Sequence, residues 1–167
     1  MQAFTKMRKL KIESIVILAM IVLVTLTYFR CNKWYDKLSS KDRRLTTVNV
    51  YETYTTKSRY YKYIYQVGNN FYSTSTNGTN VNFYGDSLEL TTFIVVYYAP
   101  DPAIHTVIWS YKLDTVSPIG KEIDTLTIDK NLIKRHTVGW DGLSPKADIN
   151  DQNEIINYKR IINSPSK

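Results

Sequence analysis

The stretch FIVVYYAPDPAIHTVIW, residues 93–109, decides the fold class of this chain. Residues 93–98 are continuously apolar, which is typical of a central strand that is buried on both faces. Proline fixes φ at about −65° and cannot donate to a β ladder, and aspartate readily accepts from neighbouring turn amides. We therefore interpret residues 99–102 as a corner between two strands. A catalytic Asp101 is the weaker interpretation, because this lone carboxylate has no acid or base partner at a fixed spacing.

The segments on either side of this corner alternate as strands do. After it, Ile104, Thr106, Ile108 and Ser110 fall on one face, opposite His105, Val107, Trp109 and Tyr111. Upstream, residues 45–54 place Thr46, Val48 and Val50 opposite Thr47, Asn49 and Tyr51. Residues 60–67 place Tyr61, Tyr63, Tyr65 and Val67 on one face, with Lys62 and Gln66 pointing away. These segments are rich in Val, Ile, Thr and Tyr, which favour pleated surfaces.

A hairpin is expected at Gly68, because residues 68–70 tolerate positive φ and residues 71–74 can return as the partner strand. Residues 75–86 predict an exposed loop with a short strand at 81–84, and residues 122–128 predict a further strand. No amphipathic helix lies between the strands, so parallel β-α-β winding is disfavoured. The expected fold is mainly β, a small antiparallel sandwich or barrel over residues 45–130.

Residues 131–167 are expected to form a C-terminal extension. Asp151 and Glu154 have the spacing of a capping box, and Ile155, Tyr158 and Ile161 follow. The pattern predicts either a short helix here or a frayed extended tail.

The N-terminal part contains one apolar segment. Sixteen uncharged residues run from Ser14 to Phe29, between Glu13 and Arg30. As a helix they span about 24 Å, and flanking Lys and Arg side chains can snorkel to complete a crossing. We interpret residues 14–30 as a transmembrane helix, after a basic segment at 1–13. A cleaved signal peptide is disfavoured, because no small residues follow the apolar core.

The positive charge of the chain lies around this segment. The formal net charge is +7, and the residues up to Arg44 carry all of it, with ten Lys and Arg against three Asp and Glu. The remainder is formally neutral, which argues against nucleic acid as a partner and leaves the lipid bilayer as the expected one. Four basic residues precede the helix and Arg30, Lys33 and Lys37 follow closely, so the positive-inside rule only weakly favours a domain outside the cytoplasm.

Residues 31–44 are polar and charged, and predict a short stalk or a helix that continues out of the bilayer. The single cysteine, Cys31, lies at the expected membrane edge, so an intramolecular disulfide and a cysteine-based metal site are both excluded. An unmodified interfacial thiol is the default interpretation. Palmitoylation and an intermolecular disulfide remain alternatives.

The chain also resembles a family. The Tyr-rich strand with Tyr63 and Tyr65, the turn at Gly68, the returning Tyr72 and the strand that ends in residues 97–102 resemble the small bacterial membrane-anchored β-domain proteins of unknown function. Their core strand closes on a Tyr-x-Pro-x-x-Pro-like corner. Two departures are the single residue between the prolines and Gly85-Asp86, which lies several residues upstream of Phe93. This resemblance implies a β fold and membrane attachment, and no activity.

No catalytic, cofactor or metal residue is identified from the sequence. His105 and His136 are the two histidines, far apart in the chain, and the structural interpretation of each is favoured. Two acidic groups are candidates, Asp124 with Asp129 and Asp141 with Asp148 and Asp151, but solvated loop positions explain them better.

The strongest positive feature is the aromatic content, with eleven tyrosines between Tyr51 and Tyr111. They either fill the interior of a small sheet domain, which is the favoured interpretation, or form a strip that binds a ligand or an envelope protein. We expect a membrane-anchored binding or scaffolding module without enzymatic activity. The alternative is a hydrolase-like enzyme whose acidic residues the sequence does not reveal.

Overall fold

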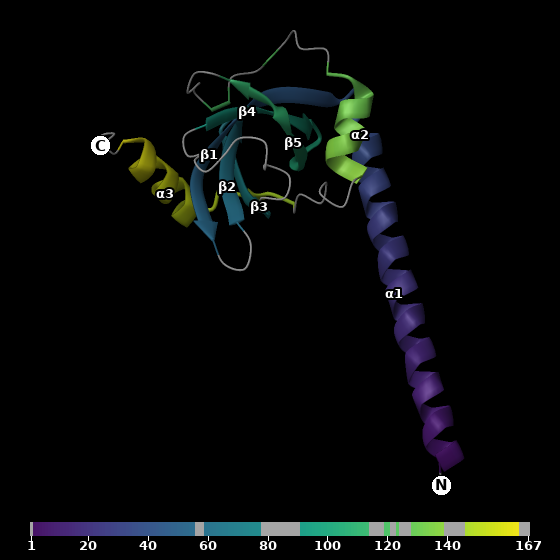
Figure 1. Ribbon diagram of the computed structural model, residues 1–167. Helices are drawn as coiled ribbons and strands as arrows, with labels where there is room; N and C mark the ends of the chain where they lie inside the picture. Colours follow the sequence, from purple (N-terminus) through teal and green to yellow (C-terminus); the bar gives the residue numbers. More distant parts are fainter. Residues whose placement is uncertain are drawn as a thin grey trace.

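The computed structural model describes residues 2–55, 59–77, 91–113, 119–120, 123, 128–138 and 146–163. An N-terminal apolar helix leads into one antiparallel sheet of six strands, which two further helices cover (Figure 1). The helices are α1 (Gln2–Leu38), α2 (Lys130–Val138) and α3 (Gln152–Ile162). The strands are β1 (Arg43–Thr55), β2 (Arg59–Val67), β3 (Asn70–Asn77), β4 (Thr91–Tyr98), β5 (Asp101–Leu113) and β6 (Asp148–Ile149). The mainly β prediction is therefore confirmed.

The strand order is β5-β4-β1-β2-β3-β6. Strands β1, β2 and β3 form a meander, and the β4–β5 hairpin adds to the other edge of β1. Strand β4 thus lies between β5 and β1, and every side chain from Thr91 to Tyr97 is buried. The prediction of a central strand buried on both faces is confirmed.

Both turns predicted around the Tyr-rich and apolar strands are present. Val67 pairs with Asn70 across a two-residue turn, and Gly68 takes φ of 58°, a conformation that glycine adopts without steric cost. At the proline corner, Tyr98 pairs with Asp101, so the turn itself consists of Ala99 and Pro100. The corner interpretation is confirmed, and it is tighter than expected because Asp101 already belongs to β5.

The sheet curls around an aromatic core. Its concave face buries Tyr61, Tyr63, Tyr65, Tyr72, Phe93 and Trp109. The Tyr63 hydroxyl lies 2.9 Å from His105 Nε2, and the Tyr65 hydroxyl donates to the Pro102 carbonyl at 2.7 Å. These bonds join β2 to β5, although β1 and β4 separate the two strands in the sheet order. The curl is therefore strong enough to bring the two strands into side-chain contact.

The choice between sandwich and barrel is not confirmed. All six strands belong to a single sheet, so the part of the chain that the structure describes contains no second layer of strands. Near the two ends of the sheet order, the Ala147 amide donates to the Ala103 carbonyl at 3.2 Å, which links the residue before β6 to β5. The observed form is one curled sheet with this backbone contact across the opening.

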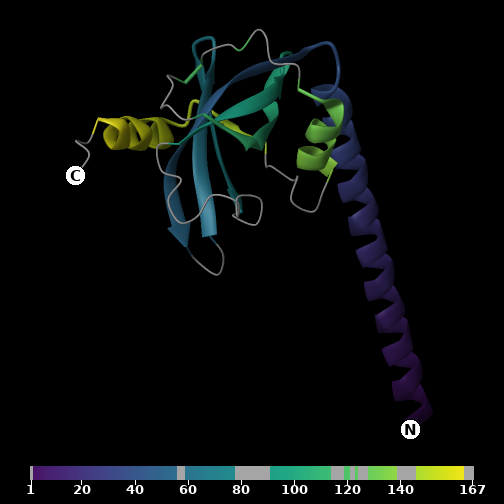
Figure 2. The ribbon, with the colours of Figure 1, turned by 45° about the horizontal axis from the view of Figure 1, so that its top comes forward.

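Two helical groups cover the convex face (Figures 1 and 2). The end of α1 and all of α2 pack on β4 and β5 through an apolar cluster that includes Leu38, Ile94, Ile108 and Ile133. Further along the same face α3 packs on β1 and β2, through the smaller cluster of Tyr51, Ile64, Ile155 and Tyr158. These two clusters and the concave core account for both faces of the sheet.

Helix α1 is continuous across the boundary expected at residue 30. It contains a segment, Glu13–Leu38, that is long and apolar enough to cross a membrane. Ile15 and Leu26 are 66% and 62% exposed, whereas Leu38 is fully buried by the domain. The interpretation of residues 31–44 as a continuing helix is confirmed as far as Leu38, and β1 then begins at Arg43. Cys31 is buried at the start of the packed part.

The second half of the chain differs most from expectation. The loop predicted from residue 75 is wrong at its start, because β3 continues to Asn77; residues 78–86, with the short strand predicted at 81–84, lie outside the described residues. Of the strand predicted at 122–128, Ile123 and Ile128 are described, and both pack in the α1–α2 cluster without belonging to a strand.

The segment interpreted as an extension packs on the domain. It includes α2, which the sequence did not predict, as well as β6 and α3. Helix α3 confirms the capping prediction: Asp151 accepts from the Asn153 and Glu154 amides, and Ile155 and Tyr158 are buried. The alternative of a frayed tail is wrong for the residues up to Asn163.

Candidate functional site

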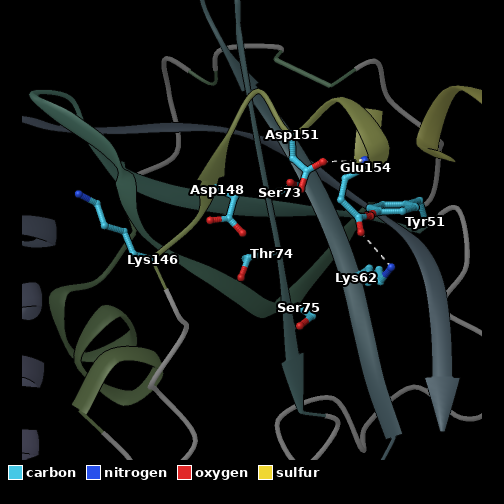
Figure 3. Close-up of a pocket in the computed structure, with 9 residues that line it drawn as sticks. All are labelled: Tyr51, Lys62, Ser73, Thr74, Ser75, Lys146, Asp148, Asp151 and Glu154. Atoms are coloured by element: carbon cyan, nitrogen blue, oxygen red, sulfur yellow. Dashed lines mark hydrogen bonds and ion pairs between the residues drawn. The ribbon is translucent and has the colours of Figure 1, made fainter. Parts of the chain in front are cut away.

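A polar pocket of about 270 Å³ lies where β3, β6 and the start of α3 meet the outer face of β1 and β2 (Figure 3). Charged and hydroxyl-bearing side chains from five segments line it. They are Tyr51, Lys62, Ser73, Thr74, Ser75, Lys146, Asp148, Asp151 and Glu154.

The register between β2 and β3 determines which side chains form the bottom of the pocket. Lys62 pairs with Ser75 and Ile64 pairs with Ser73, so both serines project from the same outer face as Lys62. The neighbouring wall is β6, in which Asp148 pairs with Ser73. The alternation of Lys62 and Gln66 away from the tyrosine face, expected from the sequence, is therefore what brings a cation into the pocket.

The connection between β6 and α3 is fixed by Asn150. This residue takes φ of 54°, in the left-handed region that asparagine tolerates better than most residues. The side-chain oxygen of Asn150 accepts a hydrogen bond from the backbone amide of Phe71 at 2.9 Å. The backbone amide of Asn150 donates to the Phe71 carbonyl, also at 2.9 Å. The next residue, Asp151, caps α3. Together these bonds set the position of Glu154 over the sheet.

Glu154 is the centre of the electrostatic network. Its Oε1 lies 3.0 Å from Lys62 Nζ, and its Oε2 accepts a hydrogen bond from the Tyr51 hydroxyl. Lys62 also lies 3.1 Å from Glu52, which accepts from Asn157 of α3 at 2.9 Å. Five side chains from β1, β2 and α3 thus form one chain of ion pairs and hydrogen bonds.

The network shifts the titration of two of its members. Partial burial alone would lower the pKa of Lys62, but hydrogen bonds and charge interactions with Glu154 and Glu52 outweigh it, and the pKa is raised. Burial is the largest cause of the raised pKa of Tyr51, and the Glu154 carboxylate adds to it. Lys62 is therefore held as a cation and Tyr51 as a neutral phenol that donates to Glu154.

The side chains that a ligand could contact are those that do not already hold the fold together. Both oxygens of Glu154 already have partners, and Asp151 is used as a helix cap. Asp148 and the two serines of β3 line the rest of the pocket, while Lys146 pairs with Asp101 at 2.9 Å (Figure 3). This set offers hydrogen-bond donors and acceptors to a polar ligand.

The residues considered from the sequence fall in separate places. Asp148 and Asp151 are brought together in the pocket, whereas Asp129 lies at the start of α2, where it accepts from the Asn131 amide at 3.0 Å. Asp124 and Asp141 lie outside the described residues. Among the described residues no group of three or more His, Cys, Asp or Glu side chains is placed to hold a metal ion.

His105 has the structural role favoured from the sequence. It is fully buried in the concave core, its Nδ1 donates to the Ala103 carbonyl at 3.0 Å, and its Nε2 accepts from the Tyr63 hydroxyl. Burial lowers its pKa to about 4, so the ring is neutral. His136 is half-buried on α2, and its backbone carbonyl accepts from Thr106 at 2.9 Å.

Most of the tyrosines on the described strands are buried. Of those on the strands, Tyr51, Tyr61, Tyr63, Tyr65, Tyr72 and Tyr97 are buried. The interpretation that they tile a small core is confirmed for these residues, and they present no surface strip. Sequence reasoning missed Tyr51, Lys62 and Glu154 as one group, because residues more than 90 positions apart form it.

Comparisons with known proteins give no match, whether with family models, curated proteins or solved structures. The resemblance to small bacterial membrane-anchored β-domain proteins therefore stays a prediction.

Proposed function

We propose that this protein is a single-pass membrane protein that holds a β domain directly at the bilayer surface, where the domain acts as a binding or scaffolding module of the cell envelope. The observation that carries this proposal is the division of α1. Its apolar part is exposed, and its last two turns are packed into the domain through Trp34, Tyr35 and Leu38. A continuous row of exposed apolar side chains from Ile15 to Phe29 needs lipid or a protein partner around it.

The continuity of α1 favours a fixed position of the domain over a flexible tether. A helix without a break transmits its orientation, whereas a polar linker would not. We place the N terminus in the cytoplasm and the domain outside it, on the basic residues nearest to the apolar segment.

Membrane insertion is tested by alkaline extraction of membranes that contain the full-length chain. We expect the protein in the pellet at its full, unprocessed mass. Recovery of the unprocessed chain in the supernatant would contradict the anchor, and loss of the N-terminal segment would indicate a cleaved leader. Reporters of opposite topology fused to the two ends test the orientation.

The polar pocket is our candidate for the binding surface, because its open groups are hydrogen-bonding side chains that the fold does not use to hold α3. A photo-crosslinking residue at Ser75 should give discrete adducts in native membranes, and Asp148→Lys should abolish them. A crosslinker at exposed Ser110 on β5 is the matched control. Equal adducts from both positions would contradict a role for the pocket.

The second candidate is a hydrolase-like enzyme, favoured by the convergence of Asp148, Asp151 and Glu154 in one pocket. It requires a carboxylate that can change its protonation state during turnover. Purified protein should then hydrolyse at least one chromogenic ester, phosphate or glycoside, and Asp148→Asn should abolish that turnover. Turnover that survives this substitution would count against the pocket as the catalytic site.

A further inference from the structure

Helix α2 belongs to the part of the chain that is formally neutral, yet it packs against the basic end of α1. Its Ile133 shares one apolar cluster with Trp34, Tyr35 and Leu38 of α1. The exposed residues Lys130 and Lys134 therefore lie on the element next to the turns of α1 that carry Arg30, Lys33 and Lys37. We call these five side chains the basic collar.

The direction of α2 brings it back toward the apolar part of α1. In both ribbon views α2 runs antiparallel to α1, from the end of α1 in the domain toward its N terminus (Figures 1 and 2). Lys134 is one turn further along α2 than Lys130, about 6 Å closer to the apolar segment. In a membrane, Lys134 would thus lie closer to the bilayer surface than Lys130.

The collar carries a net positive charge. The carboxylates nearest to them in the sequence are Asp36 on α1 and Asp129 directly before α2, so five cations stand against two carboxylates. Two cations of the collar lie on aromatic rings: Arg30 lies 5.3 Å from the centroid of Trp34, and Lys37 lies 5.4 Å from that of Tyr98. Arg30 directly follows the apolar segment, and Lys37 lies about 10 Å further along α1, so both are close to the level at which headgroups would lie.

We propose that the basic collar of Arg30, Lys33, Lys37, Lys130 and Lys134 binds anionic lipid headgroups in the leaflet on the domain's side. This inference rests on the proposed membrane anchor. A lysine near an anionic surface attracts it by about 1 kcal/mol, and the attraction decays over a Debye length of about 10 Å. The lysines of α2 extend the cationic surface sideways from the single helix and hold the domain against the bilayer.

The test uses the full-length protein in bilayers of phosphatidylcholine with a minor fraction of phosphatidylglycerol. Chain-labelled spin probes of the two lipids report how strongly each is held at the protein. We expect phosphatidylglycerol to be preferred and 0.5 M salt to reduce the preference. Lys134→Glu should lower the preference at least twofold, Lys130→Glu less, and Lys134→Arg should leave it unchanged.

Lys159→Glu is the matched control, because Lys159 is an exposed lysine on α3, which packs on β1 and β2, away from α1 and α2 (Figure 1). A preference that does not change in Lys134→Glu, or that falls equally in Lys159→Glu, would overturn the inference. Alkaline extraction of the same samples separates this outcome from failure of the anchor: a protein that stays in the pellet with an unchanged lipid preference refutes the collar and leaves the anchor standing.

Discussion

The two helical groups on the outer face of the sheet are attached by different physics. The end of α1 and α2 are held by apolar contacts around Leu38, Ile108 and Ile133. Helix α3 has a smaller apolar patch, and the chain of Glu52, Lys62, Glu154 and Tyr51 adjoins it. Salt does not screen apolar contacts and protonation does not change them, whereas partly exposed ion pairs are weakened by salt and by loss of a charge. We therefore expect the attachment of α1 and α2 to resist changes of salt and pH, and that of α3 to respond to both.

The largest effect is expected on the apolar side. Leu38→Ala removes a fully buried side chain between α1 and the sheet, and should lower the free energy of unfolding by about 2 to 5 kcal/mol. Thermal or denaturant unfolding in detergent micelles measures it. Ile162→Ala on α3 is the control, since this side chain is 40% exposed and should cost less than about 1 kcal/mol. Equal losses in the two variants would show that the two attachments do not differ.

The next effect concerns the concave core and pH. The pKa of His105 is about 4 in the folded chain, below the ordinary value of 6.5, so the unfolded state binds this proton more readily. Its contribution to stability is complete above pH 6.5 and is lost as the pH falls toward 4, by about 3 kcal/mol in total.

Unfolding free energies measured between pH 7 and 5 test this dependence. His105→Gln should flatten the profile, and His136→Gln, at the other histidine, should retain it. A profile of unchanged slope in His105→Gln would show that other groups cause the pH dependence.

The smallest effect is expected at α3. Glu154→Gln removes one of the two carboxylate charges that Lys62 faces while retaining the shape of the side chain, and should make local opening of α3 easier by about 1 kcal/mol. Hydrogen exchange of the α3 amides measures the opening, and 0.5 M salt should produce part of the same effect in the wild type. Asp148→Asn, in the same pocket, should leave the α3 amides protected as before. Faster exchange in both variants would point to the pocket as a whole.

The sequence predicted what alternation and capping determine. The faces of β1, β2 and β5, the turn at Gly68 and the cap at Asp151 follow from neighbouring residues, and the structure confirms them. Helix α2 was missed because it is only nine residues long and mostly polar, with Leu132, Ile133 and Val138 as its apolar residues. Asp129 before Leu132 and Ile133 was its only signal.

The candidate site was beyond sequence reasoning for a different reason. Lys62 was expected to point away from the tyrosine face, but nothing near it in the sequence indicates that Glu154 lies opposite. That contact depends on the path of the chain from β5 to α3. Tyr63 and His105 are a second example. The sequence predicted the face of its strand on which each lies, but it did not predict the hydrogen bond between them across the curled sheet.

The most direct test of the central claim is a nitroxide scan along α1 of the full-length protein in bilayers, which measures collision with oxygen and with a water-soluble nickel reagent. We predict that positions 15–28 collide with oxygen and exclude nickel, and that positions 31 and 38 are shielded from both reagents by the domain. Collision of positions 15–28 with nickel would contradict the account, because their side chains would then be in water.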